Sequence, residues 1–197
     1  NTGEATIQDG DARVDGRTLR RTRNRTAVIV ALLEIIREGN LHPGASEIAD
    51  RAGVSHRSIF RYFDDLDDLV RTSISYAFDE AGPLADIPDL GVGSLVERID
   101  HFVDSRMKLF ELVDGTMQLA RMRAPSIASI DEGIAEIAQV FRAQISEHFA
   151  VELDALADAE RPLLVDGILV TTSYDSFTIH RRLLGSRHLL FARKLTC

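Results

Sequence analysis

Several features that would indicate other classes of protein are missing from this sequence. It has one cysteine, Cys197, which cannot by itself form an intramolecular disulfide or a cysteine-based metal site, and this fits a reducing cytoplasm. It has no run of eighteen apolar residues, and its first ten residues are polar and acidic rather than arranged as a signal peptide. We therefore expect a cytoplasmic protein without a membrane span.

Signatures of catalysis and of metal binding are missing too. The sequence contains no H-E-x-x-H, no G-x-S-x-G and no glycine-rich phosphate loop. Its six histidines are scattered and have no metal-ligand spacing backed by acidic residues: His42, His56, His101, His148, His180 and His188. We predict no catalytic residue, no metal site and no cofactor.

The composition and the spacing of apolar residues favour an all-α fold. The chain is 45% hydrophobic and 27% charged over 197 residues, which is ordinary for a soluble globular protein. Apolar residues recur at intervals of three and four, whereas strand-like alternation and internal repeats are missing. The length allows one sizeable core or two small domains.

The segment from Ser46 to Phe63 is predicted to be a helix-turn-helix. Gly53 lies between two short amphipathic stretches, where a glycine can take the positive φ that reverses the chain. Ser55 follows as a good N-cap for the second helix. The apolar positions expected to be buried are Ile48, Ala49, Ala52, Val54, Ile59, Phe60 and Phe63.

The other face of the second helix carries hydrogen-bond donors on a helix thin enough for the DNA major groove. These donors are His56, Arg57, Ser58, Arg61 and Tyr62. An ordinary αα-hairpin with a solvated polar face would have the same pattern, and from these eighteen residues alone it stays an alternative.

Positive charge is concentrated around this segment although the whole chain has a net charge of −8. Residues 13 to 61 hold ten arginines against five acidic residues, a net charge of +5, and the 136 residues after them carry −10. Arg23 and Arg25 lie in the opening turns of a first helix that begins near Thr18, where a nearby phosphate backbone or plain solvation would explain them equally well.

From Arg17 to Val70 the sequence resembles the DNA-binding domain of the TetR family of transcriptional repressors. The matching features are a first helix that ends in REGN with Gly39 as its stop, the EIADRAGVS turn, the IFRYF ending and the start of a fourth helix near Leu69. Two positions depart from the family, because Phe60 replaces its usual tyrosine and Leu66 its usual lysine. Two phosphate contacts expected in the family therefore have no donor here.

The resemblance implies a homodimeric transcriptional regulator, expected to be a repressor, that leaves its operator when a small-molecule effector binds. Its partners would be a near-palindromic double-stranded DNA site and a largely apolar effector. The expected organisation is a mobile arm (1–16), a three-helix helix-turn-helix domain (17–64) and a helical effector-binding and dimerisation domain (65–197). The residues predicted to bind DNA are Arg23, Arg25, Ser46, Ser55, His56, Arg57, Ser58, Arg61 and Tyr62.

The helices expected in the C-terminal part follow from apolar stripes and from Gly and Pro breaks. They are a connecting helix at 66–78, a loop at 81–93, and helices at 94–113, 116–123, 127–149, 161–184 and 186–195. The stretch from Leu163 to Phe177 is apolar nearly all round, so a second copy of the chain is the economical candidate to cover it. The resemblance implies the same interface.

Arg106 is the one charged residue on an otherwise apolar stripe at positions 95, 99, 102, 106, 109 and 113. A buried arginine needs a partner, because desolvating its charge is costly. One interpretation is a structural ion pair with Asp166 or Asp175. The other is an effector site in which Arg106 fixes the polar or anionic end of a lipophilic ligand, lined by Phe102, Arg106, Phe110, Met117, Met122, Phe141, Tyr174 and Phe177.

Two other classes of function stay open beside the regulator. A small helical enzyme is disfavoured because the chain lacks the residue patterns of known active sites. An adaptor that does not bind DNA would leave both the arginine concentration and the helix-turn-helix pattern unexplained.

Overall fold

The computed structural model describes residues 16–184, and over this range the chain forms helices and turns without any strand. This confirms the all-α expectation. Residues 1–15 of the arm expected at 1–16 and the helix expected at 186–195 lie outside the described residues, while Gly16 already belongs to the first helix. In chain order the helices are α1 (Gly16–Arg37), α2 (Ala45–Ala52), α3 (His56–Tyr62), α4 (Leu66–Ala85), α5 (Leu95–Arg123), α6 (Ala128–His148), α7 (Ala150–Asp154), α8 (Arg161–Thr171) and α9 (Tyr174–Leu184).

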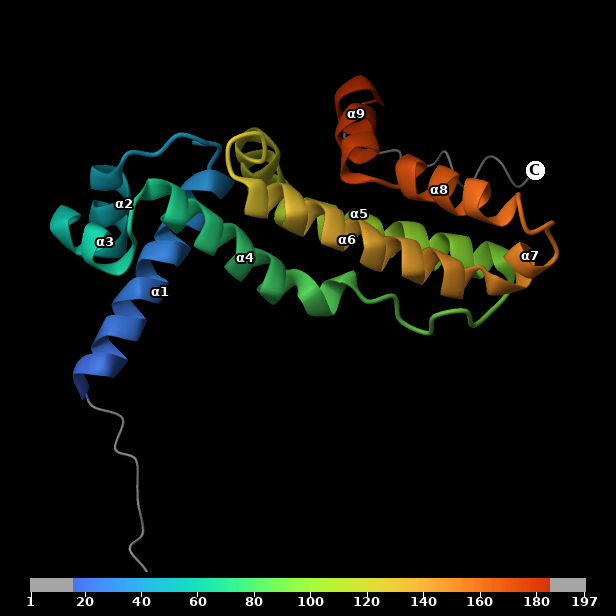
Figure 1. The fold of residues 1–197 in the computed structure, drawn as a ribbon, viewed down its shortest axis with the longest axis horizontal. Coiled ribbons are helices and arrows are strands. Elements are labelled where there is room, and N and C mark those ends of the chain that lie inside the picture. Colours follow the sequence, from blue (N-terminus) through green and yellow to red (C-terminus); the bar gives the residue numbers. More distant parts are fainter. Residues whose placement is uncertain (1–15, 185–197) are drawn as a thin grey trace, which may run out of the picture.

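The molecule is elongated, with the short helices α2 and α3 at one end and the long helices α4, α5 and α6 along its length (Figure 1). α1 packs against α2, α3, α4 and the C-terminal half of α5, so it connects the short helices to the long ones. α8 lies on α6 and α7, and α9 leaves it at a steep angle to contact α5 (Figure 1).

The turn between α2 and α3 is built as the sequence predicts. Gly53 has φ 66° and ψ 32°, in the left-handed region. The amides of Gly53 and Val54 donate to the carbonyls of Asp50 and Ala49 at 3.2 and 3.0 Å, which satisfies the end of α2. Ser55 takes the N-cap place of α3 with an extended backbone, but its hydroxyl lies 2.8 Å from that of Ser58 instead of capping the helix.

The face of α3 that is buried differs from the prediction at two positions. Ile59 is fully buried, so the residues three and four places on, Tyr62 and Phe63, share its face. Phe60 is turned by about 100° from Ile59 and is 47% exposed, whereas Tyr62 is only 9% exposed. The expectation of a buried Phe60 and a freely exposed Tyr62 was therefore wrong.

α4 is longer than predicted and runs through Gly82 and Pro83 to Ala85. The φ of proline suits a helix, and its cost is the missing amide hydrogen bond to Asp79. Asp79, Gly82 and Pro83 are all exposed, so water can satisfy the carbonyl that is left over. The loop expected at 81–93 begins only at Asp86.

α5 is one continuous helix where two were predicted, with Gly115 in its interior. A Cβ on Gly115 would lie 3.1 Å from both the Cγ2 and the carbonyl oxygen of Ile36. Gly115 therefore lies where α1 and α5 approach closely, and it does not break the helix.

The single helix expected from 161 to 184 is two helices that meet at Thr172 and Ser173. Thr172 donates its hydroxyl hydrogen to the carbonyl of Ile168 at 2.7 Å, and Ser173 donates to Val170 at 2.8 Å. The Ser173 hydroxyl also accepts the amide of Ser176 at 3.2 Å, which caps α9. These local bonds compete with helix continuation. The short α7 was not predicted.

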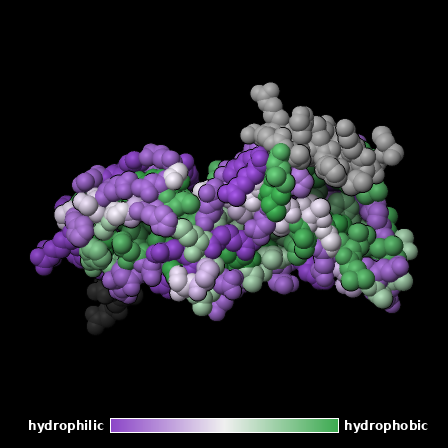
Figure 2. Space-filling model, turned by 90° about the horizontal axis from the view of Figure 1, so that it is seen from above, coloured by the Kyte–Doolittle hydropathy of each residue, from purple (hydrophilic) through white to green (hydrophobic). Residues whose placement is uncertain are grey.

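The largest core, called here the N-terminal core, lies between α1, α2, α3 and α4 and is closed by the far end of α5 and the start of α6. Two smaller clusters fill the other end of the molecule. α8 keeps an apolar face open, with Leu163 71% and Val170 67% exposed. Figure 2 shows hydrophobic side chains gathered at the α7 and α8 end.

Candidate nucleic-acid interface and ligand cavity

The exposed face of α3 carries most of the donors predicted for it. His56, Arg57 and Arg61 are exposed and Ser58 is half-buried. The ring of His56 packs against that of Phe60 with centroids 5.2 Å apart. Ser46 on α2 and Ser55 in the turn are also exposed, so the helix-turn-helix presents one polar, basic surface.

Tyr62 connects α3 to α1 instead of pointing freely outward. Its hydroxyl accepts from Asn24 Nδ2 at 3.3 Å and from Arg61 Nη2 at 2.8 Å, and the Arg61 guanidinium lies 5.0 Å from its ring centroid. The bond from Asn24, followed by that from Arg61, lowers the pKa of Tyr62. Tyr62 therefore holds Arg61 in place.

The two arginines singled out on α1 differ. Arg23 is exposed, whereas Arg25 is half-buried with its guanidinium 4.8 Å from the ring centroid of Phe63. Phe63 belongs to the N-terminal core, so Arg25 is fixed beside α3. Both cations are on the helix that packs directly against α2 and α3.

The start of α4 next to this surface is acidic. Asp65 caps the helix by accepting the amide of Asp68 at 2.7 Å, and Asp68 accepts from Arg71 at 2.6 Å. An ion pair joins Asp67 to Arg123 at the end of α5. Leu66 is half-buried against the N-terminal core, so it is packed here where a lysine is usual in the family.

A cavity of about 440 Å³ lies between α5, α7, α8 and α9. Its walls are mainly apolar, and its polar groups are Arg106, Glu152, His180 and three hydroxyls. The lining residues are Leu95, Ile99, Phe102, Val103, Arg106, Met107, Phe110, Phe149, Glu152, Leu153, Leu164, Ile168, Thr171, Thr172, Ser173, Phe177 and His180.

Four of the eight predicted effector residues line this cavity: Phe102, Arg106, Phe110 and Phe177. The other four do not. Met117 is buried in the apolar cluster that includes Phe110 and Phe177, and Met122 packs on the N-terminal core. The ring of Phe141 stacks on the Arg106 guanidinium. Tyr174 donates to the Asp114 carboxylate at 2.5 Å, and burial, followed by Asp114, raises the pKa of Tyr174.

Arg106 is buried as predicted, but it has neither of the proposed carboxylate partners. Asp166 pairs with Arg142 at 2.8 Å and Asp175 with Arg121 at 2.7 Å. Arg106 donates instead to the carbonyl of Ala85 at 3.2 Å and to Gln144 Oε1 at 2.5 Å. The structural ion pair with Asp166 or Asp175 is therefore excluded.

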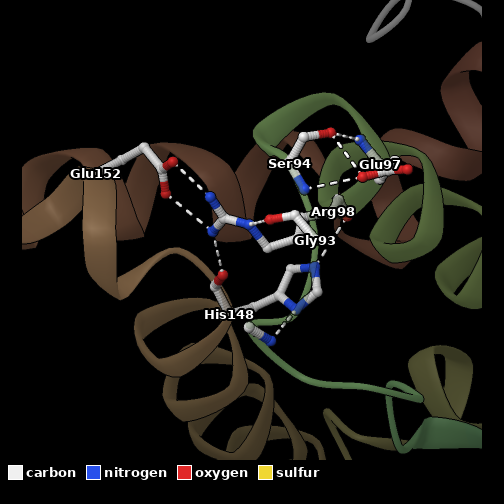
Figure 3. A network of polar contacts seen from close by, with 7 residues as sticks. Gly93, Ser94, Glu97, Arg98, His148 and Glu152 are labelled. Atoms are coloured by element: carbon white, nitrogen blue, oxygen red, sulfur yellow. Dashed lines mark hydrogen bonds and ion pairs between the residues drawn. The ribbon is translucent and has the colours of Figure 1, made fainter.

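A second buried arginine was not singled out from the sequence. Arg98 donates to Glu152 at 2.5 and 2.9 Å and to the carbonyl of His148 at 2.6 Å (Figure 3). The Nδ1 of His148 accepts the amide of Gly91, so its Nε2 carries the hydrogen donated to the Arg98 carbonyl at 2.8 Å. Arg98 was outside the predicted stripe, but it lies four residues before Phe102, so helical spacing could have placed it on the same buried face.

The described part of the chain, residues 16–184, has neither a metal-binding cluster nor a membrane-spanning helix. Within that range no three His, Cys, Asp or Glu side chains are grouped so that they could hold a metal ion. No helix in the same range has the length and the apolar character needed to cross a membrane.

The α2–α3 geometry is that of a helix-turn-helix, and comparison with known proteins shows which family this part of the chain resembles. Residues 28–72, from within α1 into α4, match the family model of bacterial regulatory proteins, tetR family. No curated protein matches the sequence. Residues 28–72 therefore have the helix-turn-helix of the TetR family, which is a family of transcriptional regulators and not of enzymes.

Solved structures share the fold at low sequence identity. A proposed transcriptional regulator from Pseudomonas aeruginosa PAO1 has a TM-score of 0.59 and 19% identity, over 90% of this chain and 85% of that one. The multidrug binding protein EbrR, solved with imidazole, has a TM-score of 0.55 and 17% identity, over 90% of this chain and 87% of that one. A proposed fatty acid metabolism regulator from Clostridium perfringens has a TM-score of 0.55 and 17% identity, over 85% of this chain and 91% of that one.

Proposed function

We propose that this protein is a cytoplasmic, homodimeric repressor that binds a near-palindromic operator and is released by a small-molecule effector. In this proposal residues 17–64 form the DNA-binding domain and residues 65–197 the effector-binding and dimerisation domain. The observation that carries it is the exposed basic face of α3, with Arg57 and Arg61 directed away from the buried Ile59. A helix held in this way can enter the major groove while the preceding helix crosses the phosphate backbone.

The effector part of the proposal is supported by the cavity and by the contacts that lead from it. A largely apolar cavity of about 440 Å³ is within the range of small-molecule sites. One of its walls is α5, which packs along α4 and reaches α1 at Gly115. The Asp67–Arg123 ion pair adds a contact between the end of α5 and the start of α4. A shift of α5 would therefore move the helices that carry α3.

The homodimer is supported by the apolar faces that α8 and α9 leave open. Leu163, Val170 and Leu183 are each more than half exposed. Apolar side chains at this density on adjacent helices favour association with a second copy. Sedimentation should give a dimer for the native chain and a smaller species for Val170→Asp, which places a charge on that face. A monomeric native chain would contradict this part.

The test of DNA binding starts with an operator selected from random duplexes, followed by fluorescence anisotropy. Arg57→Ala should weaken operator binding by roughly 1–3 kcal/mol if it contacts a base. Lys108→Ala removes one positive charge from an exposed site on α5 and should leave affinity unchanged. If no duplex is selected, or if Arg57→Ala binds as tightly as the native chain, the adaptor alternative is favoured.

A further inference from the structure

The charge on Arg106 is not balanced by any carboxylate that the structure describes. The side chain is 3% exposed, and within residues 16–184 no carboxylate oxygen lies within 4 Å of it. Its two hydrogen-bond acceptors, Ala85 O and Gln144 Oε1, are both neutral. A buried cation is normally paired with an anion, so this one leaves positive charge in the wall of the cavity.

Two aromatic rings hold the guanidinium but do not neutralise it. Its central carbon is 3.8 Å from the ring centroid of Phe141 and 5.0 Å from that of Phe102. Burial lowers the pKa of Arg106 to about 10, so it stays protonated at neutral pH. The one carboxylate that lines the cavity, Glu152, is already paired with Arg98.

The remainder of the cavity is suited to an apolar body. Leucine, isoleucine, valine, methionine and phenylalanine side chains from α5, α7, α8 and α9 line most of it. We propose that the cavity binds a lipophilic acid, an anionic molecule with an apolar body, and that Arg106 pairs with its carboxylate. This rests on the proposed function and adds to it the chemical class of the effector.

Arg106 also connects the cavity to α4. The Ala85 carbonyl belongs to the last residue of α4 and accepts from both Arg106 Nη1 at 3.2 Å and Gln144 Nε2 at 3.1 Å. The last turn of α4 has no basic residue of its own to meet the negative end of its dipole. A carboxylate that draws Arg106 into the cavity competes with this carbonyl, and so loosens the end of the helix whose start lies beside α3.

The binding experiment compares two probes of equal chain length, decanoate and decan-1-ol, by titration calorimetry on the full-length protein at pH 7.5. The native chain should bind decanoate at least tenfold more tightly than decan-1-ol. Arg106→Met should bind both probes equally, and Arg106→Lys should keep part of the preference. Arg142→Met removes an arginine of α6 that does not line the cavity, and it should keep the full preference.

The native chain alone can overturn the proposal, so a variant that fails to fold does not leave it undecided. Failure to bind decanoate, or equal affinity for the two probes, contradicts an anion site. A preference that survives in Arg106→Met contradicts the role of Arg106. Binding of decan-1-ol by Arg106→Met at the native affinity would show that the cavity is intact and that only the carboxylate contact was lost.

Operator binding in the presence of each probe separates this inference from the proposed function. Decanoate should weaken operator binding by the native chain at least tenfold, with no such effect of decan-1-ol or on Arg106→Met. If decanoate binds with the expected preference but operator affinity does not change, release by the effector is wrong and the class of ligand stands. If decan-1-ol releases the operator equally well, the competition of the carboxylate with Ala85 is wrong.

Discussion

The two ends of this molecule bury different kinds of side chain. The N-terminal core is formed by hydrophobic residues, and the buried polar side chains on α4 and α5 that carry no charge are the small Ser73 and Thr116. The C-terminal end buries Arg98, Arg106 and His148, has two small apolar clusters and keeps a cavity between them. The N-terminal end is therefore held together by apolar packing, whereas the C-terminal end combines a few buried hydrogen bonds and ion pairs with the cavity.

This difference matches the two tasks of the proposed function. A surface that reads DNA has to keep its side chains in fixed positions, which a closely packed core provides. A ligand site needs volume that is left unfilled, and its lining loses packing contacts as a result. We therefore expect the two ends to respond differently to the same substitution.

The largest difference should appear when leucine is replaced by alanine at each end. Leu32 is 1% exposed in the N-terminal core, so Leu32→Ala should lower the free energy of unfolding by roughly 2–5 kcal/mol. Leu164 lines the cavity and is 43% exposed, so Leu164→Ala should cost less than about 1 kcal/mol. Urea unfolding of the two variants measures both values, and equal losses would remove the distinction between the ends.

The parts of the fold that the sequence predicted are those controlled by local chemistry. The α2–α3 turn follows from the positive φ of Gly53, and the burial of Arg106 follows from helical spacing around Phe102 and Leu109. Phe60 and Tyr62 were assigned to the wrong faces because apolar character was taken to mean burial. On α3 the angular position relative to Ile59 decides burial instead.

Other features depend on contacts between distant parts of the chain. Gly115 would suit a helix break equally well, and only the approach of Ile36 shows why a glycine is needed inside α5. The α7 and α8 wall of the cavity has no local signature. The acceptors of Arg106, Ala85 and Gln144, are uncharged residues 21 and 38 positions away, so the expectation of a carboxylate partner did not point to them.

The second prediction concerns the polar network at the C-terminal end. Arg98→Met removes the partner of Glu152 and of the His148 carbonyl and should lower the free energy of unfolding by roughly 2 kcal/mol at pH 7. Fully buried pairs cost more, about 3–5 kcal/mol, but Glu152 is partly exposed and can regain water.

The Arg98–Glu152 pair also predicts how the free energy of unfolding changes with pH. The hydrogen bond from Arg98 lowers the pKa of Glu152 below its ordinary 4.5, so the folded state holds this proton less tightly than the unfolded state. The stabilisation is therefore present above about pH 4.5 and is lost as the pH falls through the folded value. In urea unfolding at a series of pH values, Arg98→Met should lose less stability on acidification than the native chain. Parallel curves would contradict the pairing.

The third prediction concerns the contact between α5 and α1 at Gly115. Gly115→Ala places a methyl group 3.1 Å from Ile36, whose carbonyl oxygen cannot move easily, and we expect a net loss of about 1–2 kcal/mol. Gly133→Ala is the matched control, because nothing lies within 4 Å of its added Cβ in α6. The control should gain roughly 0.5–1 kcal/mol from the helix propensity of alanine. If both variants gain stability, the contact between α1 and α5 is not close.

The smallest effect is expected on the exposed face of α3, where Phe60 replaces the tyrosine that is usual in the family. Phe60→Tyr adds a hydroxyl to a side chain that is 47% exposed, so it should not disturb the N-terminal core. If the position faces the phosphate backbone, the new hydrogen bond should tighten binding to any duplex by about 0.5–1.5 kcal/mol.

Salt dependence separates this hydrogen bond from an added charge. Phe60→Tyr is neutral and should leave the slope of log affinity against log salt unchanged, whereas Leu66→Lys should tighten binding and steepen that slope by about one unit. Arg23→Ala should make the slope of log affinity against log salt shallower by about one unit. Phe60→Leu keeps the site apolar and serves as the control, with affinity close to that of the native chain. If Phe60→Tyr binds no more tightly than Phe60→Leu, position 60 does not face the phosphates, and its aromatic ring has another role on this surface.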